Sequence, residues 1–79
     1  EPKWGRLTSK EANKRINAFV YDPKPGATLT LQGPDSLPKR AFLIETHETI
    51  NANPAEGGFS FTLPANLPDP NMAVIAFEW

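Results

Sequence analysis

His47 is the residue in this sequence whose side chain is best suited to transferring protons near neutral pH or to binding a metal ion. It lies between two carboxylates, Glu45 and Glu48, near the end of an expected strand. A metal site needs three or four converging ligands, and these two neighbours alone cannot complete one. We therefore expect a solvated histidine at a strand boundary, and we keep a metal ligand or a general base as the alternative interpretation.

Nucleophilic catalysis has few candidates in this chain. The sequence contains no cysteine, and its serines stand at positions 9, 36 and 60, none of them in a GxSxG pattern. The lack of cysteine also excludes a disulfide framework and a thiolate metal site. Gly57-Gly58 is typical of a turn, because no GxGxxG or GK[ST] pattern accompanies it. We expect no catalytic residue, no metal site and no cofactor.

Paired carboxylates are a second way to build a hydrolytic site, because two of them about 5 to 9 Å apart can share the work of acid and base or nucleophile. Asp22 and Asp69 each lie next to a proline, where a short acceptor side chain commonly caps backbone N–H groups in a turn. We expect that structural role for both. No neighbouring residues distinguish the other carboxylates from ordinary solvent-exposed charges. These are Asp35, Glu45, Glu48, Glu56 and Glu78.

Aromatic side chains offer a binding function, either as platforms on which sugar rings stack or as contacts at a domain interface. The candidates for such contacts are Trp4, Tyr21, Phe77 and Trp79. Both tryptophans lie near the termini of the chain on expected strands. We favour a role for them in the core or at an interface, with the sugar platform as the alternative.

The charge balance and the hydropathy exclude several classes of partner. The 79 residues include 8 basic and 9 acidic ones, so there is no basic footprint for nucleic acid or for an anionic membrane. The longest apolar run, residues 72–77, is far shorter than the roughly 20 residues that span a bilayer. The first residues resemble no signal peptide and there is no initiator methionine. We expect a single domain, residues 1–79, excised from a larger protein.

Nine prolines and five glycines argue against long helices, because proline removes a backbone donor and fixes φ. Short apolar segments separated by turn residues instead predict an all-β fold, a small antiparallel two-sheet Greek-key β-sandwich. A run with three prolines, residues 64–70, suits a crossover between the sheets. The seven expected strands are residues 4–9, 15–22, 27–32, 40–46, 49–53, 59–63 and 72–79, with a polar turn at 10–14.

Three of these strands are apolar on both faces. A two-layer sandwich has one interior, so such strands require a second covering surface, which predicts an interface with another domain or subunit. The opposed sets are Met72, Val74 and Ala76 against Ala73, Ile75, Phe77 and Trp79 in the last strand, Leu43 against Phe42 and Ile44 in the fourth, and Val20 against Phe19 and Tyr21 in the second.

Several short motifs also follow one another in a specific order over almost the whole chain. In order, they are Trp4-Gly5-Arg6-Leu7-Thr8, Val20-Tyr21-Asp22, Gly26, Leu29-Thr30-Leu31, Gly33, Ala41 and Leu43, Gly57-Gly58, Leu63-Pro64 and Pro68-Asp69-Pro70 before the apolar segment 72–77. This order and spacing resembles the C-terminal β-sandwich domain of the retaining α-L-fucosidases. The sequence departs from that pattern at Asp22-Pro23, where relatives often carry Asp-Trp-Pro.

The resemblance implies a non-catalytic accessory domain that packs on and stabilises a (β/α)-barrel of the same parent chain. The parent would be secreted, periplasmic or lysosomal, and it would hydrolyse α-L-fucosidic bonds in glycans with retention of configuration. Its catalytic residues would all lie in the barrel, because none maps onto this chain, and the final strand here would be the last strand of the enzyme. The alternative is an autonomous carbohydrate-binding module that contacts a fucosylated glycan. An Ig-like adhesion or adaptor domain is a third candidate.

Overall fold

A computed structural model describes residues 3–10 and 14–79 of the chain, and in these residues every regular element is a strand. No helix in the described part of the chain is long and apolar enough to cross a bilayer. The seven strands confirm the predicted all-β class. Their bounds are β1 Gly5–Lys10, β2 Arg15–Tyr21, β3 Thr28–Gln32, β4 Arg40–Leu43, β5 Ala52–Ala55, β6 Gly58–Thr62 and β7 Met72–Glu78.

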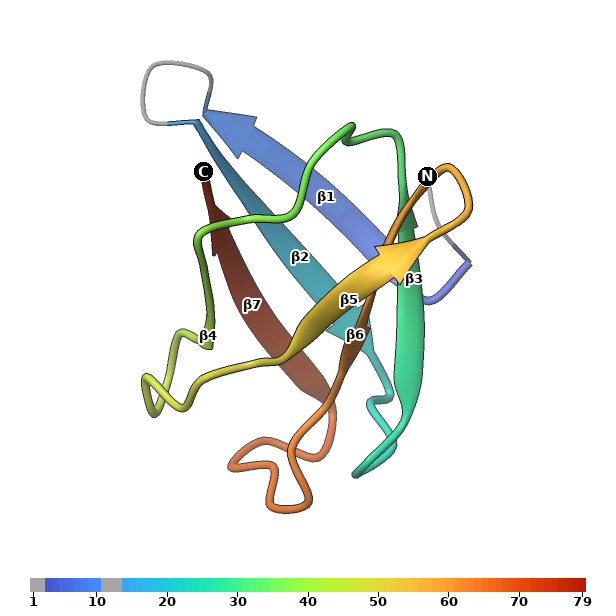
Figure 1. Cartoon of the computed structure of the whole chain (residues 1–79). Coiled ribbons are helices and arrows are strands. Elements are labelled where there is room, and N and C mark those ends of the chain that lie inside the picture. The colour runs from blue at the N-terminus through green and yellow to red at the C-terminus, as the bar shows by residue number, and fades with distance from the viewer. Residues whose placement is uncertain (1–2, 11–13) are drawn as a thin grey trace.

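The strands form two antiparallel sheets that face each other. One sheet has four strands in the order β1-β2-β7-β4, and the other has three in the order β3-β6-β5. The strands β1 and β2, and likewise β5 and β6, are sequence neighbours that pair directly, whereas every other connection passes from one sheet to the other. Figure 1 shows the resulting sandwich, with the C-terminus near the start of β4, where Arg40 pairs with Glu78.

The proline-rich connection between β6 and β7 is one of these crossings, as predicted. Pro64 is buried, and its carbonyl accepts a hydrogen bond of 3.3 Å from the Gly26 N–H. Asp69 accepts a hydrogen bond of 2.8 Å from the Asn71 N–H through its Oδ1. The capping role expected for Asp69 is therefore confirmed, and the crossing is fixed by turn chemistry on its way into β7.

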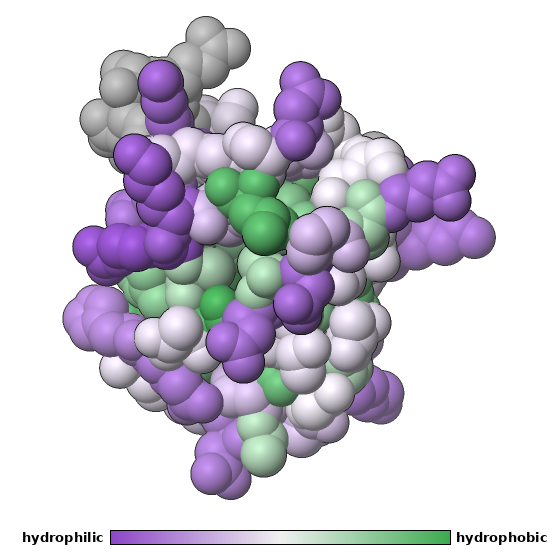
Figure 2. Space-filling model, in the orientation of Figure 1, coloured by the Kyte–Doolittle hydropathy of each residue, from purple (hydrophilic) through white to green (hydrophobic). Residues whose placement is uncertain are grey.

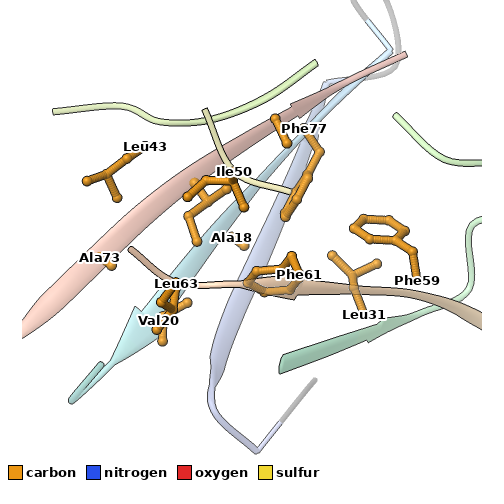
Figure 3. Packing of buried hydrophobic residues seen from close by; sticks show 12 residues of the cluster. Ala18, Val20, Leu31, Leu43, Ile50, Phe59, Phe61, Leu63, Ala73 and Phe77 are labelled. Carbon is orange, nitrogen blue, oxygen red and sulfur yellow. The ribbon is translucent and has the colours of Figure 1, made fainter. Parts of the chain in front are cut away.

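The core lies between the sheets and is built around three phenylalanines. Phe59 and Phe61 project from β6 and Phe77 from β7, and all three have no exposed surface. The ring of Phe77 lies 5.0 Å from that of Phe59 and 5.1 Å from that of Phe61, each at a steep angle. Figure 3 shows these rings meeting in the middle of the buried cluster. Edge-to-face pairs of this kind add about 0.5 to 1.5 kcal/mol each beyond the burial of their area.

The predicted strands agree with the structure except in the fourth and the fifth. The predicted strand 40–46 ends at Leu43, because residues 44–46 turn and His47 adopts a left-handed conformation with φ 64°. The Leu43 carbonyl accepts the His47 N–H at 2.7 Å and so closes this turn. The predicted boundary was wrong because the side chains of residues 44–46 would suit a strand, whereas the backbone hydrogen bonds form a turn.

The fifth strand lies further along the chain than predicted. Residues 49–51 contain only an isolated bridge between Thr49 and Phe42, and β5 spans Ala52–Ala55, so it overlaps the predicted strand only at residues 52 and 53. Pro54 lies inside this strand, one residue beyond the end of the predicted one. It is tolerated because β5 is at the edge of its sheet, where one side of the strand makes no ladder hydrogen bonds.

The two-sided character of the central strands is present in the structure. On β7, Ala73, Ile75 and Phe77 face the core and are at most 4% exposed. Val74 and Met72 lie on the opposite side, which we call the outer face of the four-stranded sheet. Its other apolar members are Phe19 and Tyr21 on β2, Phe42 on β4, and Ala76 on β7.

The phenylalanine cluster yields the first prediction. Phe61→Ala should lower the free energy of unfolding by about 3 to 5 kcal/mol, because it removes a ring that contacts both Phe77 and Trp4 and leaves a cavity. Thr30→Ala, at an exposed position of the neighbouring strand β3, should change it by less than about 0.5 kcal/mol. Urea unfolding followed by circular dichroism measures both. A loss below about 1 kcal/mol for Phe61→Ala would contradict this account of the core.

Candidate functional site

Trp4 packs against the core just before β1. Its ring meets Phe61 edge-on at 5.6 Å, and its indole Nε1 donates a hydrogen bond of 3.1 Å to the Thr30 carbonyl. Thr30 belongs to β3, an edge strand of the other sheet, so Trp4 ties the two sheets together and covers part of that edge. The polar edge of the indole is thereby already bonded within the domain.

Trp79 and Phe77 also serve the interior of the sandwich. The Trp79 ring lies 6.0 Å from Phe59, and its Nε1 donates a hydrogen bond of 3.0 Å to the Ser36 carbonyl. This bond anchors the connection between β3 and β4. Phe77 has no exposed surface, and its ring packs against those of Phe59 and Phe61 in the core. Of the four aromatic candidates, these two and Trp4 lie in or against the core, and only Tyr21 stands clear of it.

Tyr21 lies opposite Met72 in the pairing of β2 with β7, at the end of the outer face next to the proline-rich connection. Tyr21 is 47% and Met72 37% exposed. Together with Leu37, which is 41% exposed, they are the exposed large hydrophobic residues of the described chain. Two of these three side chains are thus neighbours on one surface. Tyrosine and methionine are among the residues enriched at protein interfaces.

Arginines cover much of the remaining outer face. The guanidinium of Arg6 lies 5.5 Å from the centre of the Phe19 ring, and that of Arg40 lies 4.7 Å from the centre of the Phe42 ring. Arg15 approaches Phe42 from the β2 side at 5.8 Å. Because these contacts leave Phe19 and Phe42 only partly exposed, the bare apolar face that the strand pattern implied is smaller than expected.

Glu78 holds two of these arginines in place. Its Oε2 accepts a hydrogen bond of 3.4 Å from Arg15, and its Oε1 lies 3.5 Å from the Nε of Arg40. Arg15 also donates to the Asn17 Oδ1 at 3.0 Å. The end of the outer face away from the proline-rich connection therefore carries two arginine charges, from Arg15 and Arg40, against one carboxylate, and Arg6 lies nearer the middle of the face.

A groove lies at the margin of the outer face, where β4 has ended and the proline-rich connection approaches β7. It has a volume of about 270 Å³. It is lined by Ile44, by Met72 and Val74 of β7, and by Leu67 and Pro68 of the proline-rich connection. Glu45 and Asp69 are the charged residues in its lining. The sequence analysis did not identify this groove, because it results from β4 being shorter than predicted.

His47 and the acidic residues considered for catalysis form no metal-binding group in the described part of the chain. His47 is exposed, and its ring lies 6.0 Å from that of Phe42. Asp22 lies in a left-handed turn with φ 48°. Among residues 3–10 and 14–79, no three histidine, cysteine or acidic side chains converge closely enough to hold a metal ion. On the side of the molecule turned to the viewer in Figure 2, hydrophilic residues project mainly around the edge, and hydrophobic residues are visible near the middle and at the left among pale ones.

Comparison with known proteins identifies one related architecture. No protein-family model matches the sequence, and no curated protein matches it. Among solved structures, the chain is similar to α-L-fucosidase isoenzyme 1 from Paenibacillus thiaminolyticus, with a TM-score of 0.71 and 28% sequence identity. The match covers 99% of this chain and 20% of that one, so this chain spans about a fifth of the fucosidase's length. The resemblance predicted from the order of motifs is confirmed.

The outer face yields the second prediction. The 79-residue chain should self-associate reversibly or take up a hydrophobic dye, because Tyr21 and Met72 expose adjoining apolar surface. Replacing both with serine should weaken the association and the dye uptake. Leu37→Ser is the matched control, since Leu37 is similarly exposed but lies on the connection between β3 and β4. A clean monomer with no dye uptake in analytical ultracentrifugation and fluorescence would contradict the prediction.

Proposed function

We propose that this chain is a non-catalytic accessory domain of an α-L-fucosidase, and that it packs the outer face of its four-stranded sheet against the catalytic domain of the same polypeptide. The parent enzyme hydrolyses α-L-fucosidic bonds in glycans with retention, and its catalytic groups lie in a preceding (β/α)-barrel. The domain stabilises that barrel. In this proposal the boundaries of the accessory domain are residues 1–79.

The observation that carries the proposal is that the structural match covers almost all of this chain but only a small part of the fucosidase. Nearly all of this chain corresponds to a fifth of a fucosidase chain, which is what a domain of a larger enzyme gives and what a complete enzyme does not. The likeness extends to sequence, at 28% identity, so it is more than a shared architecture.

The outer face supports packing as the mode of action. Phe19, Phe42 and Val74 lie on it half-buried, with Tyr21 and Met72 exposed beside them. A sheet face with this composition suits contact with another folded surface, because covering it removes aromatic and aliphatic area from water. Tyr21, from the aromatic candidates, is the residue we propose at the domain interface.

The arrangement of the tryptophans favours this role over the carbohydrate-binding alternative. A sugar platform needs an accessible aromatic face together with polar groups free to bond hydroxyls. The N–H donors of Trp4 and Trp79 are instead bonded to the backbone carbonyls of Thr30 and Ser36, and each ring has a core phenylalanine against it. Both side chains hold the sandwich together.

The third prediction compares the intact parent with the isolated domain. The double change Tyr21→Ala and Met72→Ala should lower the stability of the isolated 79-residue chain by less than about 0.5 kcal/mol, because both side chains are exposed there. In the parent, the same change should lower the melting temperature by several degrees, because the side chains are then buried at the interface. Differential scanning calorimetry of both proteins makes the comparison, with Leu37→Ala as the control.

Equal and small effects in the two proteins would count against the docking role. An NMR titration of the ¹⁵N-labelled 79-residue chain with L-fucose and fucosylated oligosaccharides tests the alternative, a carbohydrate-binding module. The accessory-domain proposal predicts no shifts, and an assay with a chromogenic α-L-fucoside should show hydrolysis by the parent but none by the chain alone. Shifts clustered at Trp4, Tyr21 or Trp79 at millimolar sugar would instead favour a carbohydrate-binding module.

A further inference from the structure

We propose that the groove between β4 and the proline-rich connection receives one apolar side chain of the catalytic domain, and that a lysine or arginine next to that side chain pairs with Glu45. This inference rests on the proposed function and adds to it the position and the chemistry of the anchoring contact.

The groove is a direct consequence of unequal strand lengths. β4 has four residues and β7 has seven, and they pair from Arg40 opposite Glu78 to Leu43 opposite Ile75. One further hydrogen bond, from the Ile44 N–H to the Val74 carbonyl at 3.0 Å, continues the contact before the chain turns away. The first part of β7 therefore has no neighbouring strand on this side. The space left beside it is the groove.

The walls of the groove are suited to a hydrocarbon side chain. Ile44, Leu67, Pro68, Met72 and Val74 line it with aliphatic groups and a thioether. Leu67 is partly buried and packs against the core, and the buried Leu43 and Ala73 lie beneath it, so the floor is part of the folded body of the domain. An inserted apolar side chain would exclude water from a site that is preformed, which lowers the cost of binding. Val74 and Met72 also belong to the outer face, so the groove and the proposed interface form one continuous surface.

The charges at the groove specify what must accompany the apolar side chain. Its charged residues are two carboxylates, Glu45 and Asp69, and no basic residue lines it. Asp69 is already engaged, because its Oδ1 accepts the Asn71 N–H. Glu45 is exposed and takes part in none of the ion pairs found among the described residues. A cation on the partner would complement this charge and fix the orientation of the contact.

The opposite end of the outer face strengthens the argument for a fixed orientation. There the surface carries Arg15 and Arg40, with Glu78 between them, and Arg6 lies nearer the middle. The face is therefore acidic beside the groove and basic at the far end. A partner that inserted its anchor with the reverse orientation would place like charges together at both ends, which disfavours that arrangement.

The occupant that these features fit is a folded domain and not a second copy of the chain. The arginines of this face lie over the rings of Phe19 and Phe42, and two of them pair with Glu78, so a second copy docked through the same face would have to break these contacts to supply the cation from it. The matched fucosidase, in contrast, has most of its length outside the region that this chain covers. That remainder is large enough to offer an anchor and a neighbouring basic residue.

Covalent footprinting with mass spectrometry tests the inference on the isolated 79-residue chain and on the intact parent. Carbodiimide labels exposed carboxylates, and hydroxyl radicals oxidise exposed hydrophobic side chains. The labelling of Glu45 and the oxidation of Leu67 should fall at least about fivefold in the parent, because a filled groove excludes both reagents. Glu56 and Leu37, which are exposed and lie away from the groove, serve as controls and should change less than about twofold.

Two charge reversals, Glu45→Lys and Glu56→Lys, show whether an ion pair of Glu45 with the partner is needed or whether any change in net charge has the same effect. Glu45→Lys in the intact parent should return the oxidation of Leu67 to the level of the isolated chain. Glu56→Lys makes the same change in net charge at the turn between β5 and β6 and should leave Leu67 protected. Both positions are exposed, so neither change disturbs the core, and retained fucoside hydrolysis by the parent reports that it remains folded.

The possible results also distinguish occupation of the groove from docking of the outer face as a whole. If Tyr21 and Phe42 become protected in the parent while Glu45 and Leu67 do not, the face docks but the groove is empty, and the inference is wrong. If none of the four is protected, the inference and the docking proposal both fail. If the isolated chain protects Glu45 and Leu67 at high concentration as well as the parent does, the occupant is a second copy, which also overturns the inference.

Discussion

The structure depends on a constraint carried by two strands, β2 and β7, which lie at the centre of the four-stranded sheet and place apolar side chains on both of its faces. One face meets the three-stranded sheet, and there Phe77 joins Phe59 and Phe61 in a core without exposed surface. A second layer of the same kind is absent from the described part of the chain, so the other face must be covered in another way. The arginine contacts and the groove both lie on or beside that other face.

Arginine side chains provide part of the cover. Their stems and planar head groups lie over Phe19 and Phe42 while their charges stay in contact with water, so the rings are shielded without making the surface insoluble. The cover is incomplete at the other end of the face, where Tyr21 and Met72 remain exposed and the groove opens. Such a surface is compatible with a domain that folds by itself and yet gains stability from a neighbour. A domain of this size has only a modest core, which makes that gain valuable.

Much of the fold could be predicted because the signals were local. Alternation in residues 59–63 fixed β6, and prolines with an Asx turn at Asp69 marked the crossing before β7. The Trp4-Gly5 motif also has a physical reason. A Cβ on Gly5 would clash with the Phe19 backbone carbonyl, so only glycine fits at this point of β1. The end of β4 and the position of β5 could not be predicted, because they depend on a turn at His47 and on Pro54 being at a sheet edge. The groove lies where β4 ends early, so it could not be predicted from the sequence either. One arginine contact did have a sequence signal, since Arg40 and Phe42 are two residues apart on one strand and therefore share a face. The contacts of Arg6 with Phe19 and of Arg15 with Phe42 join different strands and had no such local signal.

The proposal on which the others rest is that the outer face of the four-stranded sheet docks against the catalytic domain of a parent fucosidase. The most direct measurement is the solvent-accessible area of Phe19, Tyr21, Phe42, Met72 and Val74 in a crystal structure of the intact parent. The account predicts that this area is largely lost against the catalytic domain and that the groove is filled by one of its side chains. A structure in which these five side chains keep the exposure they have in the isolated domain would contradict it.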